Sequence, residues 1–413
     1  MTNPEEPSRG VRWREALWLR GDSRLDLLPL AVAFFTAWYF AVELPRSDDW
    51  QLVPVIERFR NGTADFTFLS TPFNQHRMLV SYCVMAGLAI ATHWHTVVMQ
   101  MAGMLFFLVG WLSFRVGGYS PFRLFLAAVL FWGLHQYGNF NWTWQVACLM
   151  AVAMGLWAVR LLAPGEGNPA PGPLAFVGAL ALAAAASLSY GFGVCVWPAL
   201  FFVLASGKEW KRLALAVAAA ALLAAVFFRD GSLVPAADRG GFLHVAAYFF
   251  SMLGTPFGAV RHGIAAWCGV VGLGLFLWAF PKGDRFLNGA AIFGLAGIAL
   301  ATYTRSFAEV SWAEGANPRY ATEAMLVWIP AFVHLPAKGW RGWLLALLCA
   351  MTVARSLSSF PHLAYIRQAA QESSYALRHH QPGGTSLKSS QTDDDVARYA
   401  ALLEEWHYSV FRE

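Results

Sequence analysis

Long apolar runs, joined by short polar loops, leave few folds open to this sequence. Ten runs carry few or no charged residues: 27–44, 96–114, 124–137, 144–163, 174–206, 213–228, 262–280, 286–302, 321–336 and 343–357. A helix needs about 20 apolar residues to cross a bilayer, and shorter helices are tolerated where neighbours bury their ends or the bilayer thins. Because backbone polar groups in lipid must be satisfied internally, the runs predict an all-α, polytopic transmembrane protein with about 11 spans.

Composition and charge support a membrane location. Charged residues occupy 13% of the 413 positions, about half the share usual in soluble proteins. Several of the 19 Trp residues, such as Trp50 and Trp142, stand at the ends of apolar runs, where interfacial aromatic belts lie. The formal charge of +5 comes from Lys and Arg in short loops, so it does not point to nucleic acid. The five cysteines lie apart in apolar segments, which favours small buried side chains over disulfides or metal ligands.

Basic residues set the predicted orientation. Five arginines between residues 9 and 24 place the N-terminus in the cytoplasm by the positive-inside rule. The run 27–44 has the length of a span and no clear cleavage site, so we interpret it as a retained signal anchor. Segment 77–92 could cross the membrane or lie as an interfacial or re-entrant helix. If it does not cross, nearly every compact basic loop falls in the cytoplasm and the C-terminus lies outside, and we therefore predict that it does not cross.

This topology divides the chain into a cytoplasmic N-terminus (1–26), a transmembrane catalytic domain (27–357) and a short extracytoplasmic tail (358–413). The first external loop, 45–95, carries an acidic motif. In the tail, residues 371–392 are predicted to form a loop, and Thr392 or Asp393 is predicted to cap a final helix.

An acidic pair, Asp48 and Asp49, directly follows the first span. Adjacent carboxylates repel each other, which favours a raised pKa on one of them. A carboxylate held at this depth can take a proton from a hydroxyl acceptor, as a general base does. The structural alternative is that the pair marks the end of a helix at the interface.

A cationic corner follows in the same loop. His76 and Arg77 stand at the start of an apolar helix, behind Asn74 and Gln75. Backbone N–H groups at a helix start, together with positive charge, suit a phosphate. A snorkelling Arg with a capping Asn explains the same pattern.

Two further arginines, Arg305 and Arg319, stand at the ends of apolar runs on either side of a loop. An arginine at membrane depth is costly unless an anion pairs with it, so both are candidates for binding an anionic ligand. The alternative is an internal partner, for which Glu309, Glu314 and Glu323 are candidates.

Two turns combine aromatic rings with polar groups, a combination that fits the apolar face and the hydroxyl groups of a sugar. The residues concerned are Gln136, Asn139, Asn141, Trp142, Gln145 and Tyr190. Anchoring at the membrane interface explains the Trp residues, but it does not explain the amides.

Taken in order along the chain, these motifs resemble the bacterial GT-C class of membrane glycosyltransferases. The matching positions are Asp48-Asp49-Trp50, Asn74-Gln75-His76-Arg77, Gln136 to Gln145, Tyr190-Gly191-Phe192-Gly193, and Arg305 with Arg319-Tyr320. Each motif is short, and the resemblance rests on their order and on their places relative to the spans. Many members carry a large soluble C-terminal domain, whereas the tail here is short, which leaves open how an acceptor is recognised.

The resemblance implies an inverting transfer of a sugar from a polyprenyl-phosphate donor to a glycan, lipid or protein acceptor outside the bacterial inner membrane. It implies Asp48 as the base and Asp49 as support for the acceptor or a neighbouring cation. It implies that the donor phosphate meets Arg305, Arg319 or the His76–Arg77 corner. The implied substrate contacts are Trp50, Asn74, Gln75, Gln136, Asn139, Asn141, Trp142, Gln145, Tyr190 and Tyr320. Whether a divalent cation, Mg²⁺ or Mn²⁺, joins the two carboxylates stays open.

Other functions stay open as well. A transporter or flippase of a lipid-linked saccharide would more often place its ionisable residues near the middle of spans, whereas here they cluster at the extracytoplasmic edge. An acyltransferase would need an intramembrane His, and a phosphoethanolamine transferase would need a metal-binding His/Asp cluster. His334 and His362 offer neither arrangement. A structural scaffold is a further alternative.

Overall fold

The structure, a computed structural model, describes residues 24–73, 76–165, 171–227, 240–258, 263–335, 339–381 and 392–412. Within these ranges every regular element is an α- or 3-10 helix, apart from an isolated bridge between Phe73 and His76. The prediction of an all-α protein is confirmed for this part of the chain.

Within the described ranges, six segments are long and apolar enough to cross a membrane. They are α6 (Thr96–Arg115), η3 with α9 (Thr143–Leu162), α12 (Trp210–Phe227), α14 with η5 (Ile264–Lys282), α15 (Arg285–Arg305) and α17 with α18 (Gly339–Arg378). Shorter apolar helices are α2 (Leu27–Phe40), α5 (Leu79–Ala91), α10 (Pro173–Ser187), η4 with α11 (Gly191–Ser206) and α13 (Phe242–Leu253). The bundle also contains α7 (Pro121–Phe131) and α16 (Ala321–His334). By length and composition these helices mark a helical membrane protein.

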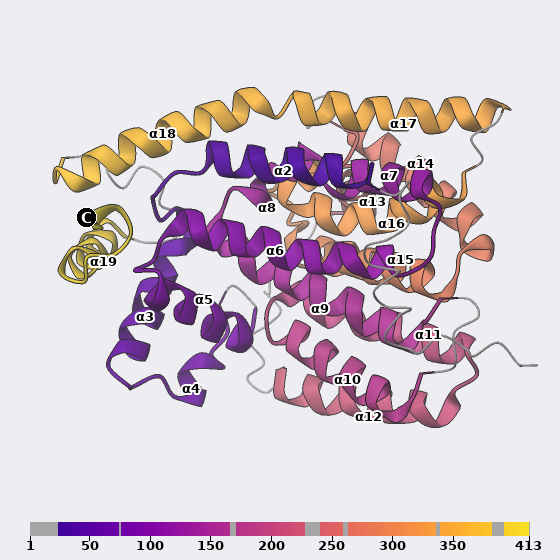
Figure 1. Ribbon diagram of the computed structural model, residues 1–413, viewed down its shortest axis with the longest axis horizontal. Coiled ribbons are helices and arrows are strands. Elements are labelled where there is room, and N and C mark those ends of the chain that lie inside the picture. The colour runs from indigo at the N-terminus through magenta and orange to yellow at the C-terminus, as the bar shows by residue number, and fades with distance from the viewer. Residues whose placement is uncertain are drawn as a thin grey trace, which may run out of the picture.

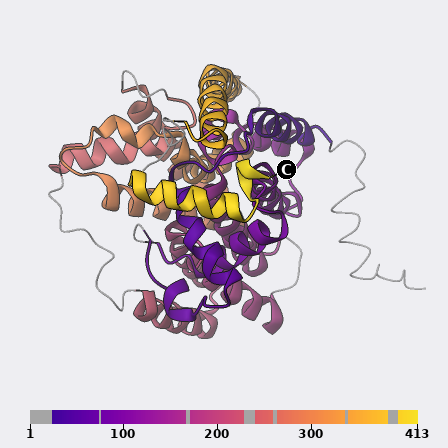
Figure 2. The ribbon, with the colours of Figure 1, turned by 90° about the vertical axis from the view of Figure 1, so that its left-hand side faces the viewer.

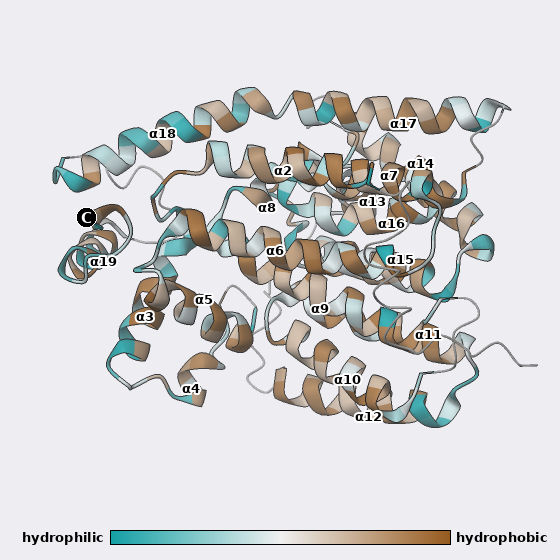
Figure 3. Ribbon diagram, in the orientation of Figure 1, coloured by the Kyte–Doolittle hydropathy of each residue, from teal (hydrophilic) through white to brown (hydrophobic). Residues whose placement is uncertain are grey.

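The bundle has central and peripheral helices (Figure 1). In the spanning window of Thr143–Leu162, 83% of the residues are buried inside the protein, whereas in that of α12 the share is 11%. Peripheral helices expose large apolar side chains, among them Leu222 and Trp343. Hydrophobic residues run along the bundle helices, while α18 (Phe360–Arg378) and α19 (Asp393–Glu405) are more hydrophilic (Figure 3). Apolar surface on this scale marks contact with lipid rather than with water.

The two ends of the bundle differ, because the loop 45–95 folds at one of them (Figure 1). The end of α2 meets the start of α6: the backbone N–H of Thr96 donates to Glu43 Oε1 at 2.8 Å, and its hydroxyl accepts from Leu44 N–H at 3.2 Å. The loop therefore leaves and rejoins the bundle at the same end. It contains η1 (Ser47–Gln51), α3 (Leu52–Arg60), α4 (Phe66–Leu69) and α5. We call this end of the bundle, at which the loop 45–95 folds, the α3 end.

The C-terminal tail also lies at the α3 end, which faces the viewer in Figure 2. After a turn at residues 358–359, α17 leads into α18 (Phe360–Arg378), so the prediction of a loop was wrong for residues 371–378. They stay helical because one face of α18, including Leu377, is buried, and because Ser374 Oγ donates to the carbonyl of Glu43 at 3.3 Å. The predicted cap of the final helix is confirmed: Thr392 Oγ1 accepts from Asp395 N–H at 3.1 Å, at the start of α19 (Asp393–Glu405).

The cysteines follow their prediction in part. Cys148 and Cys195 are buried, and Cys268 and Cys349 are partly buried. Cys83 is exposed, since it lies on an outward face of α5. None of the five forms a disulfide in the described part of the chain, which contains them all.

Candidate functional site

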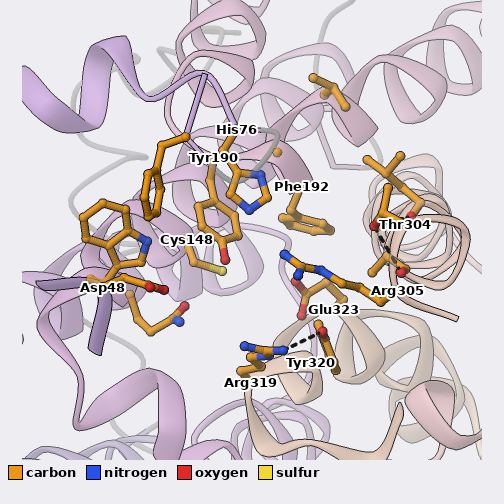
Figure 4. A pocket seen from close by; sticks show the side chains of 18 of the residues that line it. Asp48, His76, Cys148, Tyr190, Phe192, Thr304, Arg305, Arg319, Tyr320 and Glu323 are labelled. Carbon is orange, nitrogen blue, oxygen red and sulfur yellow. Dashed lines mark hydrogen bonds between the residues drawn. The ribbon is translucent and has the colours of Figure 1, made fainter. Parts of the chain in front are cut away.

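A cavity of about 390 Å³ lies where the α3 end meets the bundle. Its walls come from segments far apart in the sequence: η1, the loop before α5, the start of α9, η4, the end of α15 and the start of α16. Figure 4 shows Asp48 on one side of the cavity and Arg305 on the other, with His76 and Tyr190 between them. Acidic, cationic and aromatic side chains from separate motifs therefore share one cavity.

The two adjacent acids of η1 have different surroundings. Asp48 lines the cavity, whereas Asp49 is 1% exposed and its Oδ2 accepts from the backbone N–H of Arg46 at 3.0 Å. Burial raises the pKa of Asp49 to about 7, against the opposing effect of the Arg46 backbone N–H and charge. The turn begins at Ser47, whose φ of +52° is left-handed, and Trp142 Nε1 donates to the Arg46 carbonyl at 3.2 Å. Asp49 thus stabilises the turn that carries Asp48 on the cavity wall.

The cations of the cavity are Arg305, at the end of α15, and Arg319, in η7 (Pro318–Tyr320). Arg319 Nη2 donates to Tyr320 Oη at 3.0 Å, while its Nε is buried without a partner. Among the described residues neither arginine has a carboxylate oxygen within 4.0 Å. The internal partners considered from the sequence are therefore not engaged in ion pairs, and the two guanidinium groups can receive an anion from outside the protein.

A buried amide network holds Arg319 in position. Asn139 Nδ2 donates to the Arg319 carbonyl at 3.0 Å and to Thr322 Oγ1 at 2.7 Å. The Thr322 hydroxyl in turn donates to Gln136 Oε1 at 2.6 Å. Gln136 and Asn139, expected to contact substrate, thus lie outside the cavity lining, and their polar groups bind η7 and α16 instead.

His76 lies against Tyr190, with ring centroids 4.4 Å apart and ring planes at 28°. The close fit requires a glycine at the next position, because a Cβ on Gly191 would lie 2.2 Å from His76 Nδ1. Burial, with smaller effects from the charges of Arg305 and Arg319, lowers the pKa of His76 to about 3. The imidazole is therefore neutral at physiological pH, so it can exchange hydrogen bonds with a ligand but adds no positive charge.

Arg77, the neighbour of His76, does not line the cavity. Its guanidinium is buried, with Nε donating to the Phe227 carbonyl at 2.8 Å and Nη1 to the Ser70 carbonyl. Arg77 thereby ties the loop 45–95 to the end of α12. Asn74 and Gln75, which precede it, lie outside the described residues.

Of the residues expected from the sequence, the cavity brings together Asp48, His76, Trp142, Gln145, Tyr190, Arg305, Arg319 and Tyr320. It does not include Asp49, Trp50, Arg77, Gln136, Asn139 or Asn141. Trp50 is buried in the core around α3, and Asn141 Nδ2 donates to the Phe40 carbonyl at 3.4 Å. These residues pack or form hydrogen bonds behind the side chains that line the cavity.

Sequence reasoning missed several lining residues. Cys148 and Phe73 line the cavity without having been singled out, and their types give no signal that separates them from core or belt residues. Trp144 and Phe192 also line it; they stand within two of the quoted motifs but were not named as contacts. Glu323 also lines it, although it was considered only as an ion-pair partner for the arginines. The sequence signal for Glu323 was its place near the start of an apolar run, where an acid is costly and therefore a candidate for function.

Within the described ranges, no group of three or more His, Cys, Asp or Glu side chains is arranged to hold a metal ion. The cavity's own side chains offer two carboxylates, Asp48 and Glu323, together with two guanidinium groups, aromatic rings and a neutral imidazole. Comparisons with protein-family models, with curated proteins and with solved structures give no match for this chain.

Proposed function

We propose that this protein is an inverting glycosyltransferase of the GT-C type, which moves a sugar from a polyprenyl-phosphate donor to an extracytoplasmic acceptor. The observation that carries the proposal is that Asp48, Arg305 and Arg319 line one cavity, although they come from distant parts of the sequence. A base and a pair of cations facing each other across a cavity suit a displacement that consumes a hydroxyl proton and releases a phosphate.

In the proposed reaction, Asp48 takes the proton of an acceptor hydroxyl as its oxygen attacks the anomeric carbon of the sugar. The bond between that carbon and the phosphate oxygen breaks, and its electron pair stays on the leaving polyprenyl phosphate. Arg305 and Arg319 stabilise the negative charge that grows there. Attack from the side opposite the leaving group inverts the anomeric centre. Trp142 and Tyr190 supply aromatic surface for the sugar.

The proposal includes a topology. Because α2 and α6 meet at the α3 end, a single short helix between them cannot account for a net crossing, so we place α5 at the interface. The helices that we infer to cross are α2, α6, α7, α9, α10, α11, α12, α14, α15, α16 and α17. The basic loops then lie in the cytoplasm and the cavity faces outward from a bacterial inner membrane, with the tail on the same side.

The decisive experiment is the Asp48→Asn variant. Membranes containing the protein are given polyprenyl phosphate that carries a radiolabelled hexose, and release of bare polyprenyl phosphate is measured. Loss of the base should slow release by about a hundred- to ten-thousandfold, with expression and insertion unchanged.

Two outcomes would contradict the proposal. Release at the wild-type rate in Asp48→Asn would remove the base from the mechanism. Movement of label across the membrane without any release of bare lipid phosphate would indicate a flippase instead.

A further inference from the structure

Glu323 is an acid on the cavity wall that the proposed transfer does not use. It is 5% exposed, lies in the first turn of α16, and its Oε2 has no hydrogen-bond partner. In the described part of the chain, no Lys, Arg or His nitrogen lies within 4.0 Å of its carboxylate. Figure 4 shows it on the same side of the cavity as Arg305 and Arg319.

Close packing surrounds the aliphatic stem of the Glu323 side chain. A Cβ on Gly297 would lie 3.3 Å from Glu323 Cγ and 2.1 Å from the Phe192 ring, so only glycine leaves room for both. Phe192 is itself stacked on Phe293, with ring centroids 4.2 Å apart. The methylene stem of Glu323 therefore packs closely against Gly297 of α15 at the cavity wall.

A buried acceptor without a donor is costly, and more so when it is charged. A ligand can remove that cost by donating a hydrogen bond. The phosphate of a donor lipid cannot do so, because two anions repel each other. A sugar hydroxyl or amino group can, and the nearby arginines leave the phosphate a separate place to bind.

We propose that Glu323 accepts a hydrogen bond from a hydroxyl or amino group of the donor sugar, so that the cavity selects sugar-bearing lipid phosphate over bare lipid phosphate. The inference rests on the proposed function. It makes Glu323 a specificity-determining residue, because a site built to pair with a donor group rejects ligands that lack it.

A purely structural role makes the opposite prediction for stability. An acid in the first turn of a helix can stabilise that turn through the helix dipole, so its removal would lower the melting temperature. If Glu323 instead serves to bind a ligand, removing a carboxylate whose Oε2 is buried without a partner should leave the melting temperature equal or higher.

The test measures lipid affinity for Glu323→Leu and for wild type in detergent. The lipids are bare polyprenyl phosphate and polyprenyl phosphate that carries glucose, mannose or glucosamine. We expect the preference for the best sugar-bearing lipid over the bare lipid to fall at least about tenfold, with bare-lipid affinity unchanged or higher, because a negative charge near the arginines has been removed. A hydroxyl contact predicts that glucose or mannose shows this loss, and an amino contact predicts that glucosamine shows it most. Arg305→Ala should lower the affinity for bare and for sugar-bearing lipid by a similar factor.

The controls separate the possible failures. Glu309→Leu removes an exposed acid from the loop between α15 and α16 and should leave the preference intact. If wild type binds none of these lipids, the proposed function is wrong and the inference fails with it. If wild type prefers a sugar-bearing lipid and Glu323→Leu keeps that preference, or melts lower, the inference alone is wrong. Glu323→Gln, which preserves volume, replaces Glu323→Leu if the latter does not fold. It should lower the same preference by a smaller factor, because a neutral amide oxygen accepts a weaker hydrogen bond than a carboxylate.

Discussion

At the scale of single residues, two neighbouring acids of one turn have different surroundings, and the buried one should make stability depend on pH. Burial raises the pKa of Asp49 to about 7, so the folded chain keeps the proton that an unfolded chain releases at about pH 4. Between these values the folded state binds more protons, so this group makes stability fall as pH rises from about 4 to about 7.

Asp49→Asn should therefore flatten the dependence of melting temperature on pH across this window and melt no lower than wild type at pH 8. Asn keeps an oxygen to accept from the Arg46 N–H but cannot ionise. Sugar transfer should persist in this variant, in contrast to Asp48→Asn. Two results would contradict this assignment. One is a dependence of melting temperature on pH that is parallel to that of wild type, and the other is a loss of sugar transfer as large as in Asp48→Asn.

The residue types of the candidate site could be predicted from the sequence, but their orientation could not. An acid after a span and arginines at span ends are informative because each is costly at membrane depth. Which of Asp48 and Asp49 faces the cavity depends on a left-handed turn at Ser47. That Asn139 binds the Arg319 carbonyl rather than a ligand depends on a contact across 180 residues, which no local pattern reveals.

At the scale of elements, apolar runs predict helices well because span length and hydropathy are local properties. The ends of helices depend more on neighbours. Polar residues after residue 370 suggested a loop, yet α18 continues to Arg378 because one of its faces packs at the α3 end. The sequence also could not show that α16 and η7 are joined to the turn before α9 by a buried network.

That network gives a prediction for Thr322, whose hydroxyl links Gln136 and Asn139. Thr322→Val keeps the shape but removes one hydrogen bond from each amide and leaves the buried Gln136 Oε1 without a donor, which should cost about 1–3 kcal/mol of stability. Because the network positions Arg319 and Thr322 itself does not line the cavity, affinity for bare polyprenyl phosphate should fall as well. Thermal unfolding and lipid binding measure the two effects.

The matched control is Thr352→Val in α17, where the hydroxyl bonds only to the Leu348 carbonyl of its own helix, at 2.9 Å. It should change lipid affinity little. Equal effects of the two substitutions on lipid affinity would mean that the network does not position Arg319.

At the scale of the whole molecule, the proposed reaction depends on sidedness, since the proposed topology turns both the cavity and the tail away from the cytoplasm. Thr63, at the α3 end, and Lys211, near the start of α12, are exposed positions that the proposed topology assigns to opposite sides. In a background in which the five native cysteines are replaced, Thr63→Cys should react with a membrane-impermeant maleimide in intact cells stripped of their outer layers. Lys211→Cys should react only after the membrane is permeabilised. A charged reagent does not cross a bilayer whose hydrocarbon core is about 30 Å thick, so each cysteine reacts from one side only. Labelling of both cysteines from the same side would therefore contradict the proposed topology and the outward-facing site.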